Sequence, residues 1–123
     1  MEPPALILVV DDTEENRTIV RMCLEDAGYR LDEAVDGLDA LAHIARDRPA
    51  LVVMDLSMPV MDGWEATRRI KANAETRDIR VLVISGHATG DCVTRAEEAG
   101  ADDIAMKPCL PAELLEKVRR LLA

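Results

Sequence analysis

Aromatic side chains are nearly absent from this sequence. Its 123 residues include no phenylalanine, one tryptophan and one tyrosine. A flavin-binding electron carrier needs large aromatic side chains to sandwich the flavin ring. It also needs a hydroxyl- and glycine-rich loop to hold the flavin phosphate. Here the residues that follow the apolar run 6–10 are acidic instead. These absences argue against a flavin carrier.

Cysteines are few and their spacing is uninformative. The chain has three, which is an odd number, and no two of them form a C-x-x-C motif. This pattern argues against a disulfide framework and against a zinc site. We therefore expect Cys23, Cys92 and Cys109 to be reduced thiols.

Basic residues and long apolar runs are also scarce. Fifteen Lys and Arg stand against 24 Asp and Glu, and the resulting net charge of −9 repels nucleic acids and anionic membranes. The longest apolar run, residues 5–10, is far shorter than the roughly 20 residues of a membrane helix. The N-terminus lacks the basic start of a signal peptide. We therefore predict a cytoplasmic protein that binds neither nucleic acid nor membrane directly.

Short apolar segments predict the strands. Three β-branched runs end abruptly at polar residues, as buried strands of a parallel sheet do, and two weaker candidates accompany them. The five predicted strands are 6–10, 30–34, 50–54, 80–84 and 103–106.

Segments with helical spacing alternate with these strands. Asp12 or Thr13 can cap the first helix and Gly28 can close it, while Pro49 ends the second and Pro111 lies just inside the last. The others are predicted over 63–74 and 88–100, the latter with so narrow an apolar stripe that we expect it to be the least firmly packed. Five strand-then-helix units in 123 residues predict one α/β domain, an open parallel sheet with helices on both faces.

Polar residues follow the predicted strands at the edge where such sheets bind ligands. Asp11 and Asp12 follow the first strand, Asp55 the third, Ser85 the fourth and Lys107 the fifth. Three carboxylates in a small volume repel one another unless a cation compensates. Magnesium, or manganese, takes hard oxygen ligands and shares its coordination with phosphate groups. The sequence therefore predicts a divalent-metal site beside a phosphoryl-binding lysine.

Four motifs in this order resemble the receiver domains of two-component response regulators, the CheY-like superfamily. The resemblance covers essentially the whole chain. The motifs are Val-Asp-Asp (10–12), Met-Asp-Leu-Ser-Met-Pro-Val-Met-Asp-Gly (54–63), Val-Ile-Ser-Gly-His-Ala (83–88) and Gly-Ala-Asp-Asp-Ile-Ala-Met-Lys-Pro (100–108).

The resemblance implies a fold and a role for each site residue. The fold is flavodoxin-like, a doubly wound sheet of order 2-1-3-4-5 with five helices. Asp55 is the implied phosphoacceptor, and Asp11, Asp12, Asp55 and the backbone carbonyl of Ser57 are the implied magnesium ligands. Ser85 and Lys107 are the implied phosphoryl-binding pair, and a cis peptide bond is implied between Lys107 and Pro108.

The resemblance also implies how such a domain signals. A sensor histidine kinase or a histidine phosphotransfer protein supplies the phosphoryl group. A downstream protein then reads it at the face formed by the fourth helix, fifth strand and fifth helix. The domain catalyses only its own phosphorylation and dephosphorylation, so it is not an enzyme in the usual sense. Many relatives carry Tyr or Phe at the switch position that Ile104 occupies here, so we expect no large aromatic rotation.

Two alternatives remain beside this reading. One is a receiver-like module that binds partners without phosphorylation, although no acidic or lysine position is lost here. The other is a metal-dependent phosphatase with an aspartyl nucleophile, which would place two carboxylates two residues apart on the first strand. Because the chain ends directly after the last predicted helix, we expect a single receiver domain over 1–123 with no output domain. Either it stands alone or it was excised from a longer chain.

Overall fold

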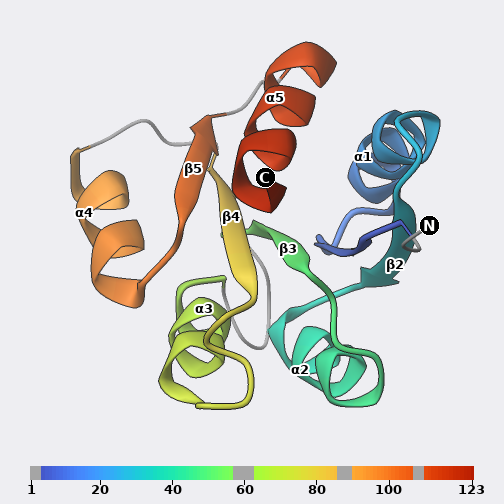
Figure 1. Cartoon of the computed structure of the whole chain (residues 1–123). Helices are drawn as coiled ribbons and strands as arrows, with labels where there is room; N and C mark the ends of the chain where they lie inside the picture. The colour runs from blue at the N-terminus through green and yellow to red at the C-terminus, as the bar shows by residue number, and fades with distance from the viewer. Residues whose placement is uncertain (1–3, 57–62, 86–89, 107–109) are drawn as a thin grey trace.

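Five parallel strands form one sheet in the order β2-β1-β3-β4-β5, which confirms the predicted topology. The computed structural model describes residues 4–56, 63–85, 90–106 and 110–123. Figure 1 shows the central strands covered by helices on both sides. The strands are β1 (Leu6–Val10), β2 (Arg30–Ala34), β3 (Leu51–Asp55), β4 (Arg80–Ser85) and β5 (Asp103–Met106).

A helix follows each strand, as the periodicity predicts. The helices are α1 (Glu14–Asp26), α2 (Gly37–Arg46), α3 (Gly63–Ala72), α4 (Gly90–Ala99) and α5 (Pro111–Leu122). Gly28 ends α1 with a φ of 97°, a left-handed conformation that favours glycine. The amide groups of Gly28 and Tyr29 donate to the carbonyls of Glu25 and Leu24, so the helix closes in a Schellman motif.

Alternate residues of the central strands belong to two hydrophobic clusters, one on each face of the sheet. Leu8 and Val10 of β1 pack in the cluster beneath α2, α3 and α4. Ile7 and Val9 of the same strand pack in the cluster beneath α1 and α5. Figure 1 shows this division, with α1 and α5 on one side of the sheet and the other three helices on the opposite side. The strand pleat therefore explains why the central runs are apolar at every position.

Several predicted boundaries shift in the structure. Strand β3 begins one residue later than predicted and includes Asp55, and β4 includes Ser85, because Asp55 pairs in register with Ile84 and Ser85 with Met106. Helix α3 ends at Ala72 rather than at residue 74. The next residue, Asn73, accepts a hydrogen bond from the amide of Glu75 through its side chain at 2.9 Å, which starts a turn that competes with the helix.

The predicted cap of the first helix is only partly confirmed. Thr13 is the N-cap residue of α1, but its side chain makes no capping hydrogen bond. Its hydroxyl instead lies 3.5 Å from a carboxylate oxygen of Asp12. Within the described residues, no helix is long and apolar enough to span a membrane.

Candidate functional site

The carboxyl ends of three neighbouring strands bring polar side chains together in the interior. Asp11 follows β1 directly, Asp55 ends β3 and Ser85 ends β4. These residues are 7%, 5% and 3% exposed, respectively. Polar groups buried to this degree are costly unless they are well partnered. Their presence at one edge marks the candidate site that the sequence predicted.

Three carboxylates form the acidic part of this site. One carboxylate oxygen from each of Asp11, Asp12 and Asp55 lies within 4.8 Å of the others, and Asp12 is exposed to solvent. Such an arrangement is repulsive by itself. The donor set consists of hard oxygen atoms, which are the ligands that Mg²⁺ and Mn²⁺ prefer. The residues therefore fit a divalent cation.

The backbone of Asp11 is held by hydrogen bonds on both sides. Its amide donates to the carbonyl of Ala34 on β2 at 3.2 Å. Its carbonyl accepts from Nη1 of Arg17 at 2.7 Å. Its carboxylate Oδ1 accepts from the amide of Thr13 at 2.9 Å. Asp11 is thus oriented by contacts with the adjacent strand, its own loop and the first helix.

The end of β3 lies very close to the start of α3. The amide of Gly63 donates to the carbonyl of Leu56 at 3.3 Å. A Cβ atom at position 63 would lie 2.4 Å from the carbonyl oxygen of Asp55 and 2.9 Å from the Cα of Leu56. Only glycine permits this approach, so Gly63 allows α3 to lie against the strand that carries Asp55.

The remaining predicted residues divide into two groups. Ile104 lies in β5, pairs in register with Val83 and is partly buried against the cluster beneath α2, α3 and α4. Ser57, Lys107 and Pro108 lie outside the described residues, so their predicted roles and the predicted cis peptide bond stay predictions.

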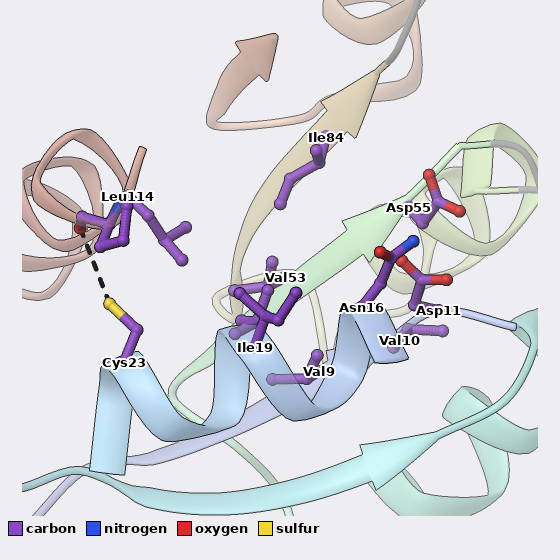
Figure 2. Close-up of a pocket in the computed structure, with 12 residues that line it drawn as sticks. Val9, Val10, Asp11, Asn16, Ile19, Cys23, Val53, Asp55, Ile84 and Leu114 are labelled. Carbon is purple, nitrogen blue, oxygen red and sulfur yellow. Dashed lines mark hydrogen bonds between the residues drawn. The ribbon is translucent and has the colours of Figure 1, made fainter. Parts of the chain in front are cut away.

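A pocket of about 470 Å³ extends from the carboxylates into the space between α1 and α5. Figure 2 shows Asn16 beside Asp11 and Asp55 at one end, with Cys23 and Leu114 at the other. The Cys23 thiol donates to the carbonyl of Pro111 at 3.6 Å and so links the two helices. The walls between these ends are mainly apolar.

Three residues that contribute to the site, Asn16, Arg17 and Gly63, are not among the site residues predicted from the sequence. The helical periodicity of the sequence could have indicated Asn16 and Arg17. The apolar stripe of the first helix, which contains Val20 and Cys23, reaches positions 16 and 17 when it is extended back by one turn. Polar residues on an otherwise apolar stripe, next to two carboxylates, indicate a site rather than a core.

Known proteins match this chain over nearly its whole length. The family model described as "Response regulator receiver domain" matches residues 7–119. The response regulator MprA of Mycolicibacterium vanbaalenii is 40% identical over 119 residues, which are 97% of this chain and 51% of that protein. The chain thus spans about half the length of the curated relatives it matches.

Solved structures agree with this match. Chemotaxis protein CheY4 of Vibrio cholerae superposes with a TM-score of 0.92 at 30% identity, covering 97% of this chain and 99% of that one. The receiver domain of sensor histidine kinase PA1611 from Pseudomonas aeruginosa, with magnesium coordinated in its active site cleft, has a TM-score of 0.89 at 31% identity. That match covers 97% of this chain and 98% of that one. The chain belongs to the response regulator receiver domain family of two-component signalling systems.

Proposed function

We propose that Asp55 accepts a phosphoryl group from a sensor histidine kinase or a histidine phosphotransfer protein, with Mg²⁺ bound by the adjacent carboxylates. The observation that carries this proposal is the placement of Asp55. It is a buried carboxylate at the end of a central strand, and one of its oxygens lies within 4.8 Å of carboxylate oxygens from Asp11 and Asp12. No metabolic substrate is needed, because the domain itself is the acceptor.

The chemistry requires little beyond position and charge balance. An oxygen of the Asp55 carboxylate forms a bond to phosphorus as the N–P bond of the donor phosphohistidine breaks, and the donor imidazole keeps the electron pair. Magnesium, when bound, neutralises charge on the transferring group. Asp11, Asp12, Asp55 and the backbone carbonyl of Ser57 are the proposed ligands, and Lys107 is the proposed cation that pairs with the phosphoryl group.

Ser85 and Ile104 complete the proposal on the output side. Ser85 ends β4 directly beside β3, so its hydroxyl is on the strand next to that of Asp55. We propose that this hydroxyl bonds the phosphoryl group and draws the following loop with it. Ile104 lies on β5 against the α4 side of the sheet. The α4–β5–α5 face is the proposed docking surface for a downstream protein.

Three further points belong to the same proposal. Residues 1–123 constitute one receiver domain, which is supported by the family match over 7–119. A cytoplasmic location fits the exchange of phosphoryl groups with kinases. The choice of magnesium as the metal is supported by the PA1611 receiver domain, whose structure has a magnesium ion coordinated in the active site cleft.

Phosphorylation with a small donor tests the proposal. Wild-type protein incubated with acetyl phosphate and Mg²⁺ should gain the mass of one phosphoryl group, because Asp55 is the only acceptor. Asp55→Asn should gain none, and EDTA should prevent the gain in the wild type. Asp47→Asn, a change at an exposed carboxylate outside the site, serves as the matched control and should label normally. Unchanged labelling of Asp55→Asn would contradict the assignment, and no labelling of the wild type would favour a phosphorylation-independent interaction module.

A further inference from the structure

Arg17 is a charged side chain in a largely buried place. It lies on α1 with its side chain 13% exposed, between the loop after β1 and the neighbouring strand β2. Burying a guanidinium group is unfavourable unless its charge and its N–H groups are partnered. The loop after β1 accepts a hydrogen bond from an N–H group of Arg17, and β2 supplies the carboxylate that balances its charge. These two partners give the side chain a defined position.

Two contacts define that position. Nη1 donates to the carbonyl oxygen of Asp11 at 2.7 Å. Nε lies 3.4 Å from a carboxylate oxygen of Glu33 on β2. The planar guanidinium can serve both partners at once, whereas a lysine ammonium on a flexible stem has no such fork. Arg17 therefore bridges the loop that carries Asp11 and the adjacent strand.

The carbonyl that Arg17 holds belongs to the peptide unit joining Asp11 to Asp12. A peptide unit is planar, so fixing its oxygen restricts the rotation of the whole plane. That rotation would change the directions in which the two successive side chains leave the backbone. Arg17 therefore restricts the relative orientation of two of the three clustered carboxylates. Because Glu33 balances the charge of Arg17, the effect of Arg17 on the three carboxylates is mainly geometric.

We propose that Arg17, held by Glu33, is a positioning residue that presets Asp11 and Asp12 to bind a divalent cation. This inference rests on the proposed function, in which those carboxylates hold the metal. Residues that orient metal ligands typically change metal affinity 10- to 100-fold when they are replaced. Removing the guanidinium should therefore weaken metal binding without touching any ligand atom.

Manganese binding measured by electron paramagnetic resonance gives a direct test, because bound Mn²⁺ no longer contributes to the signal of the free ion. Arg17→Met keeps the apolar stem and should raise the Mn²⁺ dissociation constant about tenfold or more. Arg21→Met is the matched control. It lies one turn further along α1 and also approaches Glu33, at 3.6 Å, while its other ion pair is with Glu25 on the same helix.

The control separates positioning from general stability. Both arginine variants lose a contact to Glu33, and Arg17→Met also loses the bond to the Asp11 carbonyl, so its urea unfolding midpoint should fall further than that of Arg21→Met. Because Mn²⁺ affinity is measured on folded protein, only Arg17→Met should lose it. If Arg17→Met does not fold, Arg17→Lys decides the question by the same measurement. A dissociation constant within twofold of that of Arg21→Met would overturn the inference. Failure of the wild type to bind Mn²⁺ or to be labelled at Asp55 would instead overturn the proposed function.

Discussion

Asp11 and Asp55 occupy positions at the edge of the core, next to strands that are otherwise apolar. Each is less than a tenth exposed, and together with Asp12 they concentrate negative charge in one place. Clustered carboxylates do not stabilise a metal-free fold. Their burial is better explained by chemistry than by packing, as for other functional sites where charge is concentrated. Small changes in their backbone neighbours should therefore affect the chemistry strongly.

Gly63 is the residue that tests this sensitivity. Gly63→Ala places a Cβ 2.4 Å from the carbonyl oxygen of Asp55, so either α3 or the end of β3 must move. Overpacking of this kind costs about 1 to 3 kcal/mol. We expect a loss of that size in urea unfolding and a slower rate of labelling by acetyl phosphate.

Gly28→Ala is the matched control for this substitution. Its Cβ would meet nothing within 4 Å, but its φ of +97° is unfavourable for alanine. The control should lose stability, by about 1 kcal/mol, through backbone strain alone. It should keep the wild-type labelling rate because it lies at the opposite end of α1 from the carboxylates. Equal labelling rates in the two variants would contradict the role assigned to Gly63.

Asp102 provides a second residue-level prediction, on stability against pH. Burial raises the pKa of its carboxyl group, but hydrogen bonds from Lys71, the Val81 amide and Arg80 lower the pKa more, to below its ordinary value of 3.8. The stabilisation from these contacts is therefore present above pH about 4 and is lost as the pH falls through the lower, folded-state pKa.

Asp102→Asn should show this dependence. At pH 7 it should lower the free energy of unfolding by about 1.5 to 3 kcal/mol, the usual value of hydrogen bonds to a charged group. The difference from wild type should narrow as the pH falls below about 4, where the wild-type carboxylate becomes protonated. Urea unfolding at several pH values measures both. If the difference in unfolding free energy between the two proteins stays constant down to the lowest pH at which the wild type is folded, Asp102 acts through its shape rather than its charge.

At the scale of elements, most of the side chains of α4 that the structure describes are exposed. Of its described side chains, Thr94, Arg95, Glu97 and Glu98 are exposed and Ala99 is buried. The Arg95 guanidinium carbon lies 5.1 Å from the centre of the Trp64 ring on α3, a cation–π contact that ties the two helices together. The expectation that α4 is the least firmly packed helix stays a prediction. Few buried contacts are what a responsive element requires.

Phosphorylation should therefore be read at α4 and β5. Beryllium fluoride with Mg²⁺, a phosphoryl mimic, should shift amide resonances of residues 90–106 as well as those around Asp55. Coupling of this kind is usually worth about 1 to 3 kcal/mol. Since position 104 is isoleucine, we expect movement of backbone and small side chains rather than a large rotamer change.

Ser85→Ala tests whether the Ser85 hydroxyl couples the phosphoryl group on Asp55 to α4 and β5. It removes the hydroxyl on β4 that would respond to the phosphoryl group, so the shifts over 90–106 should shrink while those near Asp11 and Asp55 persist. Shifts confined to the carboxylate end of the sheet in the wild type would rule out the proposed output face.

At the scale of the whole molecule, charge and metal binding are linked. The chain carries a net charge of −9, and three of its carboxylates are held together by the fold. Self-repulsion of this kind weakens the folded state in the absence of a cation. A ligand that binds only the folded state stabilises it in proportion to the logarithm of its concentration over its dissociation constant.

Magnesium should therefore stabilise the wild type. At a concentration 100 times its dissociation constant, the gain in unfolding free energy should be about 2.7 kcal/mol. Asp12→Asn should be more stable than the wild type without metal, because one repelling charge is removed, and should gain little from magnesium. Thermal unfolding with and without the ion, at constant ionic strength, measures both effects. Equal stabilisation of both proteins would contradict a site that uses Asp12.

The kinds of elements, their order and the functional edge of the sheet follow from the amino-acid sequence. Continuous apolar runs such as 6–10 are buried on both faces, and parallel strands bring their carboxyl ends to one edge whatever the details of packing. The sequence alone therefore places Asp11, Asp12 and Asp55 together. The strand ends could not be predicted to the residue, because they depend on register with a neighbour such as Ile84.

The contacts that position these residues come from the packing of the elements and could not be read from the sequence. The 2.7 Å bond from Arg17 to the Asp11 carbonyl, the close approach of Gly63 to Asp55 and the pocket between α1 and α5 all depend on distances between separately formed elements. Periodicity reports which face of a helix is buried, but not how near that face comes to a particular backbone atom. Packing of whole elements sets those distances, so they are properties of the assembled molecule.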